Sequence, residues 1–218
     1  MMLLYAVVPA DATAPEARGL AGQRLEMIRG MLAAVIVEEC AERLSATGED
    51  ARSFAEIICD LATTTSMLPI RFPTMLPTRS AVLAELQANE AAWRRRLTEL
   101  DGLSEVVIRV QWAEPDHESG PASNSSGTTY LLSRAAVIHR RESSVAEISE
   151  LVRAWAREIK VLHSQQGVRI ACLVANTDVP QLRDAVTSWQ QARSDRQVAV
   201  SGPWPVFSFV VDQEVVST

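Results

Sequence analysis

The sequence is short of cysteine, which limits the covalent and metal chemistry available to it. Its three cysteines, Cys40, Cys59 and Cys172, lie far apart and follow no Cys-x-x-Cys or Cys/His spacing. Neither a disulfide framework nor a zinc site is expected from this pattern, and no cofactor is implied. Free cysteines of this kind are typical of a protein kept in the reducing cytoplasm.

Positive charge and long apolar runs are also scarce. Lysine and arginine number 21 against 27 acidic residues, which gives a net charge of -6, and no basic run exceeds Arg94-Arg95-Arg96. A nucleic-acid partner is not expected from this balance. The apolar stretch at residues 1–8 is too short to span a bilayer and ends at Pro9. The sequence therefore predicts neither a signal peptide nor a lipid-membrane partner.

Catalytic signatures are missing as well. The chain contains no phosphate-binding glycine loop, no Gly-x-Ser-x-Gly elbow and no His-Glu-x-x-His helix. Its three histidines, His117, His139 and His163, are widely spaced, so they do not suggest a shared metal or a catalytic pair. We expect a protein that is not an enzyme.

The first half of the chain alternates apolar runs with amphipathic stretches. The pattern predicts a strand at 2–8 and a second strand at 31–37, with 25–29 as its paired extension and Gly30 as a bend. A helix at 49–61 follows, near a Thr47 cap. A proline-restricted edge segment at 65–77 then leads to a helix from Thr78 to Leu100. The apolar stripe expected on that last helix is Leu83, Leu86, Trp93, Leu97 and Leu100. This order reads ββαβα.

The second half begins with an alternating strand at 104–113 and a polar loop at 114–127. Residues 128–163 contain no Gly or Pro, and apolar residues recur every seven positions, which predicts one helix of about 35 residues. A break at Ser143, with Ser143-Ser144 and Glu147 capping a new helix, is the competing interpretation. A buried strand at 167–175 and a helix from Asp178 to Ala192 follow.

The chain closes on Val198–Val211, which reads VAVSGPWPVFSFVV. Two prolines forbid a regular central strand there, so the segment is expected to bend and to end in a buried apolar strand. We expect Trp204, held between Pro203 and Pro205, to be buried in the core that this segment closes. The expected fold class is α+β, with an N-terminal ββαβα domain at 1–102 and a modified ferredoxin-like domain at 103–218 that contains one long helix.

Two segments carry a resemblance to a known family. They are MLPIRFPT at Met67–Thr74, with Leu68, Pro69, Arg71 and Phe72, and SGPWPVFSF at Ser201–Phe209, with Gly202, Pro203, Trp204 and Pro205. Together with LLYAVVP at Leu3–Pro9 and TYLLSR at Thr129–Arg134, they resemble the gas vesicle protein F/L family (GvpF/GvpL). Pro73 and Val206 depart from the pattern usual in that family.

The resemblance implies a gas vesicle accessory or minor structural protein, located at gas vesicles in the cytoplasm, that binds the hydrophobic shell protein and other gas vesicle proteins during assembly. The residues expected to bind the partner lie on the first half of the long predicted helix: Tyr130, Leu131, Ala135 and Ile138. The alternative is a ferredoxin-like regulatory module that binds a small metabolite between its domains, with Arg71 as an anion contact. A structural role for Arg71 competes with that reading.

Overall fold

A computed structural model of the chain describes residues 1–44, 46–112, 139, 142–164, 167–191, 193 and 196–210. Contacts divide it into two compact units, of which the first comprises Met1–Ser104 and the segment from Trp204 onward, and the second Glu105–Pro203. The loop predicted at 114–127 lies outside the described residues, as does most of the first half of the predicted long helix.

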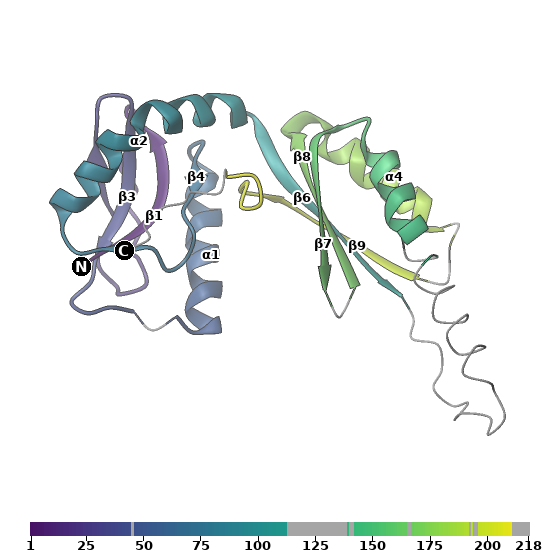
Figure 1. Ribbon diagram of the computed structural model, residues 1–218, viewed down its shortest axis with the longest axis horizontal. Coiled ribbons are helices and arrows are strands. Elements are labelled where there is room, and N and C mark those ends of the chain that lie inside the picture. The colour runs from purple at the N-terminus through teal and green to yellow at the C-terminus, as the bar shows by residue number, and fades with distance from the viewer. Residues whose placement is uncertain are drawn as a thin grey trace, which may run out of the picture. The chain divides into compact units, whose positions relative to one another are not determined.

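The first unit is built on a sheet of the order β2-β3-β1-β4, with β5 also paired to β1 (Figure 1). Its strands are β1 (Met2–Pro9), β2 (Glu26–Arg29), β3 (Ala33–Glu39), β4 (Leu68–Pro69) and β5 (Met75–Leu76). β1 pairs antiparallel with β3, β4 and β5, and β2 pairs antiparallel with β3. The predicted bend at Gly30 is thus the turn of a hairpin.

Two helices cover this sheet. Helix α1 (Gly48–Ala62) begins at the predicted Thr47 cap, where a reciprocal pair of bonds with Asp50 satisfies the first turn. Helix α2 (Arg79–Leu100) is capped by Thr78 and packs on β1, β2 and β3. Its buried residues are outside the cluster that α1 forms, which places α2 on the opposite face. Of the predicted stripe, Leu83 is exposed and Val82 takes the inner position.

A β-bulge in β1 changes which of its side chains point towards helix α1. Leu4 pairs with Val37 and Ala6 with Ile36, so Tyr5 has no partner on β3. The extra residue reverses the alternation of side chains, and Leu3, Tyr5, Ala6 and Val8 all join the core beneath α1. The backbone carbonyl of Tyr5 instead accepts a hydrogen bond from Ile70 N at 2.8 Å. The bulge therefore anchors the proline-rich segment that follows α1.

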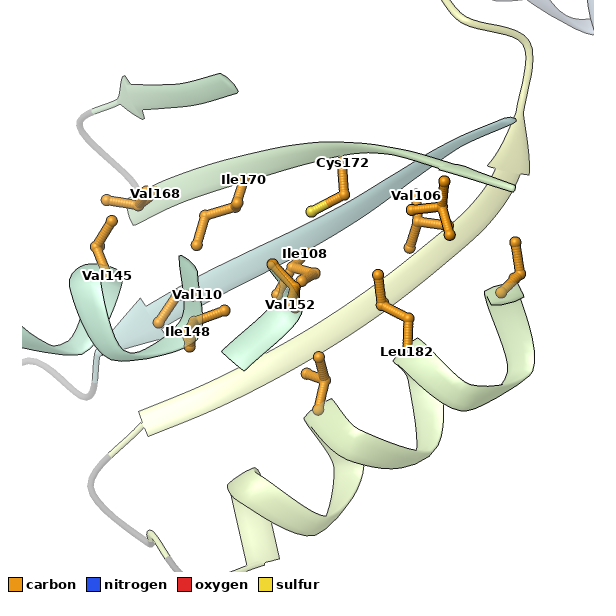
Figure 2. Close-up of a cluster of buried hydrophobic side chains, with 13 residues drawn as sticks. Val106, Ile108, Val110, Val145, Ile148, Val152, Val168, Ile170, Cys172 and Leu182 are labelled. Carbon is orange, nitrogen blue, oxygen red and sulfur yellow. The ribbon is translucent and has the colours of Figure 1, made fainter. Parts of the chain in front are cut away.

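The second unit has the ferredoxin-like order of elements. It runs β6 (Leu103–Trp112), a helix at 142–152, β7 (Ala156–Ser164), β8 (Gly167–Ala175), a short 3-10 turn (Asn176–Asp178) leading into α4 (Val179–Gln191), and β9 (Arg196–Trp204). The sheet order is β7-β8-β6-β9. Figure 2 shows Val106, Ile108 and Val110 of β6 directed towards Ile148 and Val152 on the first helix and Leu182 on α4.

The single long helix predicted for 128–163 is wrong in its second half. The helix ends at Val152, and a turn follows in which Trp155 N donates to Val152 O at 3.0 Å. Residues 156–164 then form β7, paired antiparallel with β8. Ile159 lies seven residues after Val152, so a helix and a strand can both pack it against the core, and the seven-residue spacing could not tell them apart.

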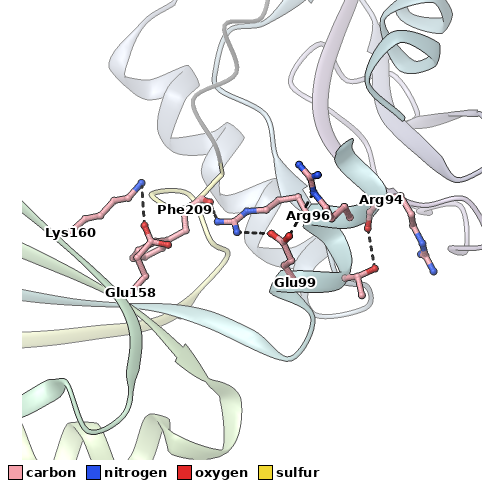
Figure 3. A network of polar contacts seen from close by, with 8 residues as sticks. Arg94, Arg96, Glu99, Glu158, Lys160 and Phe209 are labelled. Carbon is pink, nitrogen blue, oxygen red and sulfur yellow. Dashed lines mark hydrogen bonds and ion pairs between the residues drawn. The ribbon is translucent and has the colours of Figure 1, made fainter. Parts of the chain in front are cut away.

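The closing segment also differs from the prediction. β9 continues through Trp204, but residues 205–210 form a turn rather than a buried strand. Trp204 is 40% exposed, whereas Val206 and Phe209 are 4% and 1% exposed. The Phe209 carbonyl accepts a hydrogen bond from Arg96 at 2.6 Å, and Arg96 also pairs with Glu99 (Figure 3). Phe209, rather than Trp204, therefore takes the buried position in this segment.

We therefore expect Phe209→Ala to lower the free energy of unfolding by about 3–5 kcal/mol, as the loss of a buried aromatic ring does. Trp204→Ala should cost clearly less, because its ring already contacts water. Urea unfolding of both variants beside the parent protein measures the difference. A larger loss of unfolding free energy for Trp204→Ala than for Phe209→Ala would contradict this assignment.

Candidate functional site

The partner-binding residues predicted from sequence, Tyr130, Leu131, Ala135 and Ile138, lie outside the described residues. The structure brings none of the other predicted site residues together into a catalytic arrangement. Within the described ranges no group of three or more His, Cys, Asp or Glu side chains is placed to hold a metal ion. Among the helices described, none is long and apolar enough to cross a membrane.

The Leu68–Phe72 motif covers the free side of β1. Leu68 and Pro69 are buried and pair with Val7 and Ala6, next to the bulge. Phe72 packs on Phe54 of α1, with ring centroids 5.0 Å apart. The Arg71 side chain is exposed and forms no ion pair with any described residue, while its carbonyl accepts a hydrogen bond from Thr74 Oγ1. Apart from Arg71, the residues of this motif are thus held by strand pairing and by packing on α1.

The Gly202–Pro205 motif shapes the end of β9. Gly202 has φ of 115°, a conformation that favours glycine, and its peptide bond to Pro203 is cis. The Arg183 guanidinium of α4 donates to the Gly202 carbonyl. Ser201 Oγ donates to Val107 O at 3.4 Å, so the strand is fastened at neighbouring residues. These contacts give the motif a backbone role.

A buried polar network lies beneath the loop at 10–25, and sequence patterns did not reveal it. The Glu38 side chain on β3 is fully buried, and its Oε2 accepts a hydrogen bond from Tyr5 Oη at 2.8 Å. Backbone N–H groups of the loop complete it: Leu20 N donates to Tyr5 Oη at 2.9 Å, and Gln23 N donates to Glu38 Oε1 at 3.0 Å. Burial is the main cause that raises the pKa of Tyr5 far above its ordinary value.

The network fixes the loop through contacts that only a small residue permits. A Cβ on Gly19 would lie 2.2 Å from Glu38 Oε2 and 2.6 Å from Tyr5 Oη. The Tyr5 ring in turn stacks on Phe54, with centroids 4.8 Å apart. One tyrosine thus joins the bulge, the core under α1 and the loop, which is an architectural rather than a chemical use of a buried carboxylate.

The most exposed large apolar residue described is at the β2–β3 turn. Met31 is 90% exposed and Leu32 is 47% exposed, and both lie in the turn, although the sequence predicted a strand at 31–37. We call this pair the apolar tip. Its backbone is braced from α2, because Glu90 Oε1 accepts hydrogen bonds from Leu32 N at 2.7 Å and from Ala33 N at 3.2 Å. These hydrogen bonds, of which the one from Leu32 N has the largest effect, hold the pKa of Glu90 below its ordinary value.

Gly30 makes the brace possible. A Cβ at this position would lie 2.2 Å from Glu90 Oε1, so a larger residue would push the carboxylate away. Gly30 N also donates to Ala33 O at 2.8 Å, which closes the turn. The tip is therefore an apolar pair on a fixed backbone. Such a pair loses little conformational entropy when a partner covers it.

Comparison with known proteins identifies the family. A family model described as gas vesicle synthesis protein GvpL/GvpF matches residues 1–211. The chain belongs to this family. It is 28% identical to gas vesicle protein F of a Streptomyces species over 211 residues, covering 84% of this chain and 86% of that protein. It is 26% identical to gas vesicle protein L of the same strain, covering 100% and 96%.

Two solved structures share the fold. Gas vesicle protein GvpF from Microcystis aeruginosa matches with a TM-score of 0.77 and 14% identity, covering 96% of this chain and 98% of that one. GvpF from an Anabaena species matches with a TM-score of 0.81 and 17% identity, covering 96% and 95%. The predicted family and α+β fold class are confirmed, and family membership supports a role connected with gas vesicles.

The polar network can be tested by removing one hydroxyl. We expect Tyr5→Phe to destabilise the protein by about 1–3 kcal/mol, because Glu38 Oε2 loses its donor and Leu20 N its acceptor. A double-mutant cycle with Glu38→Gln, followed by urea unfolding, should show coupled rather than additive losses. Additive losses would mean that the two side chains act separately.

The cysteines give a second test. Burial raises the pKa of the Cys172 thiol to about 12 and also raises the pKa values of Cys40 and Cys59. A raised thiol pKa lowers the thiolate fraction at pH 8, so the three thiols differ mainly in access: Cys40 and Cys172 are buried. We expect a disulfide-exchange reagent to modify Cys59, which is partly exposed, before the other two. Rapid reaction of Cys172 in the native protein would contradict this burial.

Proposed function

We propose that this chain is an accessory or minor structural protein of gas vesicles that binds the hydrophobic shell protein and supports vesicle assembly. A shell subunit that must turn an apolar face towards gas is prone to aggregate before assembly, so a protein that covers this face stabilises it. The observation that supports binding is the apolar tip, which projects Met31 and Leu32 from a backbone held by Glu90. Its partners would include other gas vesicle proteins, and it would be located in the cytoplasm and at the vesicle.

The tip suits an apolar partner better than a charged one. Fully burying two side chains of this size contributes about 3–6 kcal/mol, which suffices for recognition when the backbone is already ordered. The net charge of -6 provides no strong attraction for an acidic ligand. Tyr130, Leu131, Ala135 and Ile138, which the sequence predicts on a helix, remain a second proposed surface for the same partner.

We expect Met31→Ser with Leu32→Ser to weaken capture of purified shell protein more than tenfold in a pull-down, since the exposed apolar area is lost without disturbing the core. Glu90→Ala should weaken capture to a smaller extent, because the tip keeps its side chains but loses its brace. The readout is the amount of shell protein retained at several salt concentrations, and salt should matter little.

Leu83→Ser is the matched control, because Leu83 is an exposed leucine of the same unit on α2. It should leave capture unchanged. Leu131→Ser with Ile138→Ser tests the second surface in the same assay. Full capture by the tip variant, with its melting temperature unchanged, would remove Met31 and Leu32 from the proposal. If the Leu131→Ser/Ile138→Ser variant also captured the shell protein fully, neither proposed surface would be the binding site.

A further inference from the structure

Strand β7 lies at the edge of the second sheet. In the order β7-β8-β6-β9 it pairs with β8 on one side, and no described strand pairs with its other side. It is nine residues long, and Val161 and Leu162 are 37% and 45% exposed. A long edge strand presents a row of backbone donors and acceptors to any extended chain that matches it. Natural proteins usually block such an edge or use it.

The two faces of β7 differ in character. Ile159 and Val161 pair with Cys172 and Ile170, which belong to the core beneath the helices. Glu158 and Lys160 pair with Leu173 and Ala171 and therefore lie on the other face. Their side chains remain 44% and 42% exposed and form a loose ion pair at 3.8 Å (Figure 3).

We infer that β7 pairs antiparallel with β7 of a second copy of this chain, about a two-fold axis at Ile159. This register places Glu158 opposite Lys160 of the second copy, and Lys160 opposite its Glu158. Both residues of each pair lie on the same face, as direct neighbours in an antiparallel ladder must. Opposite charges facing each other across a ladder are stabilising, and the symmetry forms the contact twice.

The neighbouring registers are less favourable. An axis at Glu158 or at Lys160 would set like charges directly against each other, which is destabilising. An axis at Val161 would set each Lys160 against Leu162. The sequence Glu158-Ile159-Lys160 therefore selects one alignment. The bulge between Ala156 and Glu158 limits how far the pairing can slide.

The other face of the paired strands also fits. Val161 of the second copy would lie near Ala156 and Arg157, over a groove lined by Ser149, Arg153, Ala156 and Ile159. Growth beyond two copies is disfavoured because the opposite edge, β9, contains Pro203, which has no N–H to donate. The pairing is therefore closed by symmetry, and it is small enough to be weak. It does not depend on the shell-binding proposal.

Sedimentation velocity of the full chain at low salt tests the pairing. We expect reversible dimers with a dissociation constant on the order of 100 µM, a range that suits a small interface. Lys160→Glu alone and Glu158→Lys alone should each weaken dimerisation at least about tenfold, since both symmetric contacts become repulsive. The double variant E158K/K160E, which restores opposite charges, should dimerise like the parent.

Mixing the two single variants separates this contact from the ion pair within one strand. E158K and K160E chains repel their own kind but complement each other, so an equimolar mixture should form heterodimers that neither forms alone. Circular dichroism of each variant confirms folding. A parent protein that stays monomeric to about 300 µM, three times the expected constant, would overturn the inference. So would a mixture that stays monomeric, or single variants that dimerise like the parent.

Discussion

The extra residue in β1 is the constraint on which the first unit depends. Without the bulge at Tyr5, strict alternation would place Ala6 and Val8 on the face away from α1, and the core under that helix would lose both. The same residue directs its carbonyl to Ile70 and its hydroxyl to Glu38. Position 5 thus joins the proline-rich segment and the loop at 10–25 to a sheet that is apolar on both faces.

Much of this fold could be predicted from the sequence because its elements follow local rules. Thr47 and Thr78 begin helices as capping residues should, and the proline spacing confines 65–77 to short edge pairings. The ferredoxin-like assignment is confirmed even though β7 was missed. Spacing alone could not find β7, because the position of Ile159 against the core fits both a seven-residue helical repeat and a strand.

Three further features of the structure could not be predicted in the same way, because each reverses a statistical rule. Met31 is apolar and follows a strand-like pattern, yet it is exposed in the β2–β3 turn, where Glu90 accepts hydrogen bonds from Leu32 N and Ala33 N. Trp204 is a large aromatic residue between two prolines, yet Phe209 occupies the buried position. Glu38 is charged, yet it is buried because a tyrosine and a backbone N–H satisfy it.

The residues that carry the family resemblance and the residues of the two proposed contact surfaces are different sets. Leu68, Pro69 and Gly202 are held by strand pairing, burial or a backbone conformation that their neighbours require. The backbone of the apolar tip is instead braced by Glu90 and that of β7 by β8. Met31, Leu32, Glu158 and Lys160 on these elements keep exposed side chains. Side chains at such positions can change without disturbing the core. The fold can thus be retained while these exposed side chains vary.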